Sequence, residues 1–145
     1  MRRLRAFDIA FYGPMIEKRG RTPKGRITKT QIPLFANYVF LHGDAESRYR
    51  ALTTNCISRD IVVSNGQQLT EDLRQLRRLI VSGGSILPET KLAPGMRVRV
   101  RSGPLLGQEG LILQRRGETR LLVAVRFLQQ GASVQVDEAD LELLT

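Results

Sequence analysis

Histidine and cysteine each occur only once in the 145 residues, as His42 and Cys56. A serine–histidine or cysteine–histidine catalytic pair would have to use His42, and a metal site built from several histidines or thiolates cannot form. Cys56 has no second cysteine with which to form an internal disulfide. The sequence also lacks the phosphate-binding pattern G-x-x-x-x-G-K-S/T. It therefore predicts a binding protein rather than an enzyme, with no cofactor and no metal site.

Positive charge is the chemistry that the chain does carry. It has 23 Lys and Arg against 14 Asp and Glu, a net charge of +9, and residues 1–30 hold nine of these cations against two acids. An excess of this kind indicates an acidic partner such as nucleic acid.

The densest group of cations lies between residues 18 and 29, where Gly20, Pro23 and Gly25 interrupt any helix. The composition predicts a flexible, exposed loop whose cations contact phosphates without reading the base sequence. The alternative is a solvated loop whose charge serves solubility alone. The candidate nucleic-acid-binding residues are Lys18, Arg19, Arg21, Lys24, Arg26 and Lys29.

Hydrophobic patterning must supply the elements that position these groups. Apolar residues alternate with others near the N-terminus, as in a strand, and a nearly continuous apolar and aromatic run after Pro33 predicts a strand buried on both faces. Asp44 is a good N-cap for a short helix, and a second apolar face at helical spacing follows Thr70. The predicted elements are strands over 7–11, 33–41 and 57–63, and helices over 45–54 and 70–82.

The pattern changes after residue 82. Five glycines and prolines between residues 83 and 95 predict a linker or a domain boundary. Beyond it the sequence shows short alternating segments separated by turns and no helical spacing, which is typical of a small barrel. The predicted strands are 97–101, 109–114, 119–128, 132–136 and 140–143.

The segment V-R-V-R-S-G-P-L-L-G-Q-E-G from Val98 to Gly110 carries three spaced glycines, Gly103, Gly107 and Gly110. Glycine permits positive φ and a close approach of two backbones, as a strand–loop–strand arch requires. The spacing resembles the KOW motif, an element of SH3-like barrels in ribosomal and transcription proteins. The resemblance covers most of residues 94–145, and it implies that the three glycines are structural.

A second segment, P-L-F-A-N-Y-V-F from Pro33 to Phe40, resembles the P-L-F-P-G-Y-V-F signature of the NusG family of transcription elongation and antitermination factors. The chain departs from it at Ala36 and Asn37, and asparagine still tolerates the positive φ of a turn. The two motifs stand in the order expected for that family, in which an α+β N-terminal domain precedes a KOW domain.

The resemblance implies an α+β fold. An N-terminal antiparallel sheet with helices, of RNP-like architecture, should precede a small all-β SH3-like barrel. Family members begin with a strand carrying a Trp-Tyr-type pair and a helix, whereas this chain has no Trp, so we expect that start to be missing. The loss would leave apolar strands partly uncovered and the N-terminal half marginally stable. The expected domains are 1–84, a linker over 85–95, and the barrel over 96–145.

In NusG-like factors the N-terminal domain docks on the clamp helices of RNA polymerase through an apolar patch around the signature strand. The resemblance therefore implies that Phe35, Tyr38 and Phe40 lie at or just beneath a polymerase-binding face. The alternative is that Phe35 and Phe40 belong only to the core, and strand alternation favours both roles, with one face inward and the other outward. The basic loop would lie near DNA or RNA at the polymerase. The KOW domain would contact the termination factor Rho or a small-subunit ribosomal protein.

The runner-up hypothesis is an RNA- or ribosome-binding KOW protein that makes no contact with polymerase. The segment from Pro33 to Phe40 argues against it, because a ribosomal KOW protein would not need that signature. An enzyme is disfavoured by the residue counts above. We expect a cytoplasmic protein of bacterial type, since no run of 18 apolar residues and no secretory signal occurs.

Overall fold

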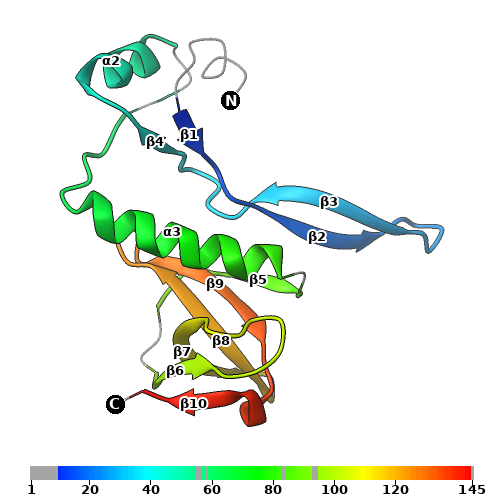
Figure 1. The fold of residues 1–145 in the computed structure, drawn as a ribbon. Coiled ribbons are helices and arrows are strands. Elements are labelled where there is room, and N and C mark those ends of the chain that lie inside the picture. The colour runs from blue at the N-terminus through cyan, green and yellow to red at the C-terminus, as the bar shows by residue number, and fades with distance from the viewer. Residues whose placement is uncertain (1–9, 55–56, 58, 83, 93–94, 145) are drawn as a thin grey trace. The chain divides into compact units, whose positions relative to one another are not determined.

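The computed structural model describes residues 10–54, 57, 59–82, 84–92 and 95–144 (Figure 1). The chain divides into two compact units, one of residues 1–15 with 31–62 and one of residues 16–30 with 63–145. The two α-helices and three antiparallel sheets of the described residues make this a mixed α+β protein, as expected for the fold class. In the described part of the chain, no helix is both long and apolar enough to cross a membrane.

The described part of the first unit contains a two-stranded sheet and one helix. Strand β1 (Ala10–Tyr12) pairs antiparallel with β4 (Phe40–His42), and α2 (Ala45–Thr53) follows. The Asp44 carboxylate accepts a hydrogen bond from the backbone N–H of Ser47 at 2.9 Å, which caps the helix and lowers the pKa of Asp44 below its usual value. The helix predicted in this segment is confirmed.

Among the described residues, the first unit buries the apolar side chains of Leu34, Phe35 and Ala51. Ala51 of α2 is fully buried, and the partly buried side chains of Phe11, Val39 and Ile57 pack against it. Several large apolar side chains of this unit stay exposed among the described residues: Tyr38, Leu41, Tyr49, Ile61 and Val62. So little buried apolar surface offers limited stabilisation, because the hydrophobic contribution scales with the area removed from water.

Two sequence-based predictions for this unit need correction. The strand expected over 33–41 is wrong, because the chain turns after Phe35 and only its last residues form β4. Leu34 and Phe35 are both buried although they are neighbours, so the apolar run reflects packing at a turn rather than a strand buried on both faces. The strand expected over 57–63 is also wrong, because residues 57 and 59–63 form no strand. Of the strand expected at 7–11, residues 10–11 lie in β1, and residues 7–9 lie outside the described residues.

The basic segment also differs from its prediction. Strands β2 (Met15–Arg21) and β3 (Ile27–Pro33) pair with each other as a two-stranded hairpin, drawn in blue and cyan in Figure 1. The flexible loop expected there is wrong, because the breakers Pro23 and Gly25 fall in the hairpin turn and interrupt neither strand.

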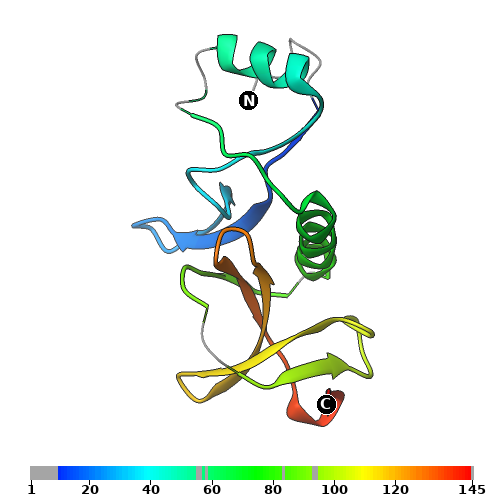
Figure 2. The same cartoon turned by 90° about the vertical axis from the view of Figure 1, so that its left-hand side faces the viewer.

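The second unit is built around a strongly twisted six-stranded antiparallel sheet (Figure 2). Along the sheet the strands follow the order β10-β6-β7-β8-β9-β5. Their bounds are β5 (Ile86–Glu89), β6 (Arg97–Val100), β7 (Glu109–Arg115), β8 (Glu118–Val125), β9 (Gln130–Gln135) and β10 (Leu141–Leu143), with a 3-10 turn at Glu138–Asp140. The closed barrel is not confirmed, because β10 and β5 remain as the two edges of this sheet.

The helix of the second unit is α3 (Gly66–Val81), which packs against β8 and β9 (Figure 1). It begins four residues before Thr70, because the side chain of Asn65 accepts a hydrogen bond from the N–H of Gln68 at 3.0 Å and caps it earlier. Residues 120–123 of β8 are all buried, so both faces of this central strand are covered. The interval expected as a linker, 85–95, contains β5 and lies within this unit.

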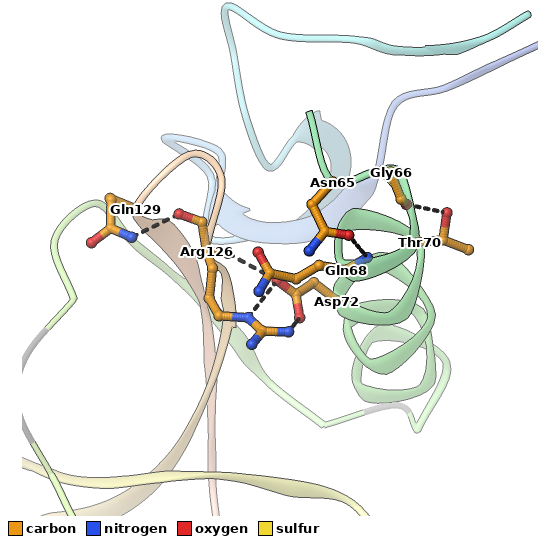
Figure 3. A network of polar contacts seen from close by, with 7 residues as sticks. All are labelled: Asn65, Gly66, Gln68, Thr70, Asp72, Arg126 and Gln129. Carbon is orange, nitrogen blue, oxygen red and sulfur yellow. Dashed lines mark hydrogen bonds and ion pairs between the residues drawn. The ribbon is translucent and has the colours of Figure 1, made fainter. Parts of the chain in front are cut away.

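Polar contacts attach α3 to the sheet. The Asp72 carboxylate accepts three hydrogen bonds from Arg126, from its backbone N–H at 3.0 Å, Nε at 3.1 Å and Nη2 at 2.9 Å (Figure 3). The bond to Asp72 raises the pKa of Arg126 above its usual value. One turn further along, the Gln108 Nε2 amide donates to Gln75 Oε1 at 2.6 Å. The charge-assisted, two-pronged contact between Asp72 and Arg126 fixes the angle of the helix as well as its position.

Candidate nucleic-acid interface

The β2–β3 hairpin has a defined register. At its turn the N–H of Thr22 donates to the carbonyl of Arg26 at 2.9 Å, so these two residues face each other. A Cβ added at Gly20 would lie 3.1 Å from the Thr28 hydroxyl oxygen, which makes Gly20 and Thr28 the next facing pair on the same side. The following pair on that side is therefore Lys18 and Thr30.

Side chains alternate between the two faces of a strand, so the register sorts the cations. Arg19, Arg21 and Lys29 share one face of the ribbon, and Arg19 lies directly opposite Lys29. Lys18 and Arg26 share the other face, with Arg26 beside the turn, and Lys24 lies in the turn. Three of the six candidate residues therefore lie on one face of the hairpin, two lie on the other, and one lies at its tip.

These cations are solvated and largely unpaired. All six residues are exposed. Among the described residues, only Arg19 has an ion-pair partner on the hairpin, with its Nε 3.2 Å from Glu17 Oε1. Both of those side chains are well exposed, so the pair contributes little to stability. The remaining cations are available to an external anion.

A two-stranded ribbon of this kind is suited to present cations to a row of phosphates. Such a ribbon is narrow enough to enter the major groove of a duplex. Residues 15–33 contain no aromatic side chain, so the hairpin offers no platform on which bases could stack. The geometry favours contact with the nucleic-acid backbone over recognition of particular bases.

The three residues expected to bind polymerase lie in the first unit. Phe35 is only 3% exposed, and its ring packs edge-on against Phe40 with a centroid distance of 6.0 Å. Phe40 is half-buried, whereas Tyr38 between them is 41% exposed. The structure thus packs Phe35 against Phe40 and leaves Tyr38 exposed.

The glycines of the KOW-like segment lie around the loop between β6 and β7. Gly103 and Gly107 have φ values of +87° and +86°, a region that other residues rarely adopt. Gly110 lies in β7, where a Cβ would overlap the carbonyl oxygen of Leu122 in the neighbouring strand. Each position has a steric reason for glycine.

No family model matches the chain, and no curated protein matches it with significant sequence similarity. The functional argument therefore depends on the residues and their geometry. His42 ends β4 and is exposed, and Cys56 lies outside the described residues. Within the described part, no three His, Cys, Asp or Glu residues group in a way that could hold a metal ion.

Proposed function

We propose that this protein is a NusG-like transcription elongation or antitermination factor. It binds RNA polymerase through the surface around Tyr38 and contacts neighbouring nucleic acid through the β2–β3 hairpin. One observation supports the proposal above the others. The segment that resembles the family signature presents one exposed aromatic, Tyr38, which lies in sequence between Phe35 and Phe40, whose rings pack together, and the segment follows directly on the basic hairpin along the chain.

The docking step needs no catalysis. Aromatic side chains are enriched among the residues that dominate the binding free energy of interfaces, so the exposed Tyr38 is suited to act as an anchor. Leu41 is also exposed in this segment and adds apolar surface. The partner surface that suits such an anchor is a pair of helices with an apolar groove, such as the clamp helices of the polymerase.

The hairpin acts as a second, weaker contact. Its cations attract phosphates through release of bound counterions, with an affinity that falls as salt rises. Once the first contact tethers the protein to polymerase, the second contact becomes intramolecular and gains from a high effective concentration. A factor bound at both places would keep the polymerase closed over its template and suppress pausing. The six-stranded unit would then be the part that contacts Rho, a small-subunit ribosomal protein or RNA.

A pull-down of RNA polymerase from a nuclease-treated bacterial lysate tests this proposal. The full chain should retain polymerase, and Tyr38→Ala should lose at least about 90% of it, because removal of an anchor residue commonly weakens binding by tenfold or more. Tyr49→Ala is the matched control, because Tyr49 is 69% exposed on α2 and lies outside the signature segment. Equal losses in the two variants, or no polymerase with any of them, would contradict the proposal.

The second candidate function, an RNA- or ribosome-binding protein without polymerase contact, is favoured by the exposed cations of the hairpin alone. The same experiment separates the two. If RNA or ribosomes are captured before nuclease treatment and polymerase is never captured, the second function replaces the first.

A further inference from the structure

A cavity of about 300 Å³ lies in the second unit, beside the turn between β7 and β8. Three arginines are among the residues that line it, which are Leu87, Arg115, Arg116, Glu118 and Arg120. A volume at the lower end of the range for small-molecule sites, about 300–1,000 Å³, suits a small ligand. None of these residues takes part in the surfaces described above.

Arg120 lines the cavity and is buried, with its side chain only 4% exposed. Its Nε donates to Ser133 Oγ at 2.9 Å, and its Nη2 donates to the carbonyls of Ser133 and Ser85 at 2.9 and 3.2 Å. Its Nη1 donates only to Glu118 Oε2, at 3.3 Å. A guanidinium has five N–H donors, so one N–H on Nη1 has no acceptor among the described residues.

Arg115, which also lines the cavity, forms an ion pair with a buried carboxylate. Its Nη2 lies 2.7 Å from Glu89 Oε2, and Glu89 is only 3% exposed. The Ser133 hydroxyl donates to the other oxygen of Glu89 at 2.6 Å, which links this pair to Arg120. The network fixes both guanidinium groups before any ligand arrives, and such preorganisation favours binding.

Arg116 is the residue that the fold does not explain. It has a φ of +52° and, with Gly117 at +78°, forms the two-residue turn between β7 and β8. Asparagine, aspartate or glycine normally occupies such a position, because other residues are strained there. Arg116 has no polar partner among the described residues, so no hydrogen bond or ion pair of its side chain offsets the backbone strain. A residue held in an unfavourable conformation at a cavity is a reason to look for a function.

We propose that this cavity binds the phosphate group of a small phosphorylated ligand, with nucleoside monophosphates as the ligand class. Arg115, Arg116 and Arg120 supply the donors, and guanidinium groups match a phosphate in geometry as well as in charge. Glu89 is already neutralised by Arg115. Glu118 is about half exposed and makes the longest contact to Arg120, so the phosphate replaces the Glu118 carboxylate as the acceptor for Arg120 Nη1. The half-exposed Leu87 offers an apolar surface to the sugar or base.

Isothermal titration calorimetry on the full chain tests the proposal with three probes: inorganic phosphate, adenosine monophosphate and adenosine. Phosphate and the nucleotide should bind, the nucleotide more tightly, and adenosine should not. Binding should shift the backbone amide NMR signals of residues 115–120. If phosphate binds and the nucleotide adds nothing, the nucleoside part of the proposal is wrong. If adenosine binds as well as the nucleotide, or only long polynucleotides bind, the site is not a phosphate site of this kind.

Matched variants separate the cavity from general surface charge. Arg116→Gln should weaken binding about tenfold, as expected for loss of a charge-assisted hydrogen bond, whereas Arg97→Gln should not, although it removes the same charge from exposed β6. Arg116→Asn relieves the strain and should also lose binding. Glu118→Gln should strengthen binding, and Glu142→Gln on β10 should leave it unchanged. Equal effects within either matched pair would overturn the proposal.

Discussion

The arginines of the β2–β3 hairpin and several of those in or beside the six-stranded sheet have the same side chain and different surroundings. In or beside the sheet, four arginines among the described residues pair with carboxylates: Arg99 with Glu109 and Glu142, Arg115 with Glu89, Arg120 with Glu118, and Arg126 with Asp72. In the hairpin, among the described residues, only Arg19 has such a partner, and that pair is exposed.

The difference shows that charge alone does not identify a binding surface. A guanidinium whose donors are used by the fold contributes to stability, because removing it leaves buried acceptors without partners. A guanidinium that the fold does not use is available to an external anion at little cost. Arg116, in the turn between β7 and β8, and Arg97, on β6, have no side-chain partner among the described residues, and in this respect they resemble the hairpin cations.

The largest expected effect is at Arg120. Substitution by methionine keeps much of the side-chain volume and removes the buried guanidinium, which should lower the free energy of unfolding by about 3 kcal/mol or more. Arg21→Met, at an exposed hairpin position, should change it by no more than about 0.5 kcal/mol. Urea unfolding of the two variants followed by far-UV circular dichroism compares them directly. Similar values for the two would show that burial does not distinguish the two groups of arginines.

The contact between Asp72 and Arg126 should come next. Asp72→Ala removes the acceptor of three N–H groups and should destabilise the attachment of α3 by about 1–3 kcal/mol. Amide hydrogen exchange in α3 should accelerate accordingly. Glu71→Ala is the control, because Glu71 is exposed on the same turn of the helix. Exchange rates in α3 that do not differ between the two variants would mean that apolar packing alone holds the helix.

Much of the second unit could be predicted because strand alternation and β-propensity agree there. The repeated V-R-V-R pattern gives β6, and Arg116-Gly117 marks the hairpin between β7 and β8. The open edge formed by β5 could not be predicted, because Ile86–Glu89 lie among glycines and prolines and gain their strand conformation by pairing with β9. Tertiary pairing overrides local propensity at such a place.

The sequence identifies the hairpin residues as basic but does not predict the hairpin itself. Four residues of β3 are β-branched and favour a strand: Ile27, Thr28, Thr30 and Ile32. The neighbouring glycines and proline favour a loop, and for this reason the sequence predicts one there. The sharing of one face by Arg19, Arg21 and Lys29 depends on the register, which composition does not contain. The buried network around Arg120 had no sequence signal, since its partners are distant along the chain.

A smaller change in the free energy of unfolding is expected for variants of the hairpin, where nucleic-acid binding rather than stability should change. The triple variant Arg19→Gln, Arg21→Gln, Lys29→Gln should unfold like the wild type and bind duplex DNA more weakly. The slope of log K against log salt should fall by about 0.9 for each cation that contacts a phosphate. Exposed arginines of α3 and β6 provide a charge-matched control: Arg74→Gln, Arg77→Gln and Arg97→Gln. The same change of slope in the control would mean that net charge alone drives binding.

The smallest effect is a pH dependence in the first unit. Arg48 donates a hydrogen bond to Asp60, which lowers the pKa of Asp60 below its usual value, so this contact stabilises the unit above the pKa of the unfolded chain, about 3.9. The stabilisation is lost as the pH falls through the lowered pKa of the folded state. Asp60→Asn should therefore reduce stability slightly at pH 6 and not at pH 2. NMR signals of α2 followed through an acid titration measure it, and a difference that persists at pH 2 would assign the effect to something else.

The most direct test of the account is binding of the purified full chain to purified RNA polymerase in the absence of DNA and RNA. The account predicts saturable binding that the hairpin triple variant retains and that Tyr38→Ala weakens at least about tenfold, as for loss of an anchor residue. Tyr49→Ala should bind like the wild type. Absence of binding by the wild type, or loss of binding with the hairpin variant and not with Tyr38→Ala, would contradict the assignment of polymerase docking to the surface around Tyr38.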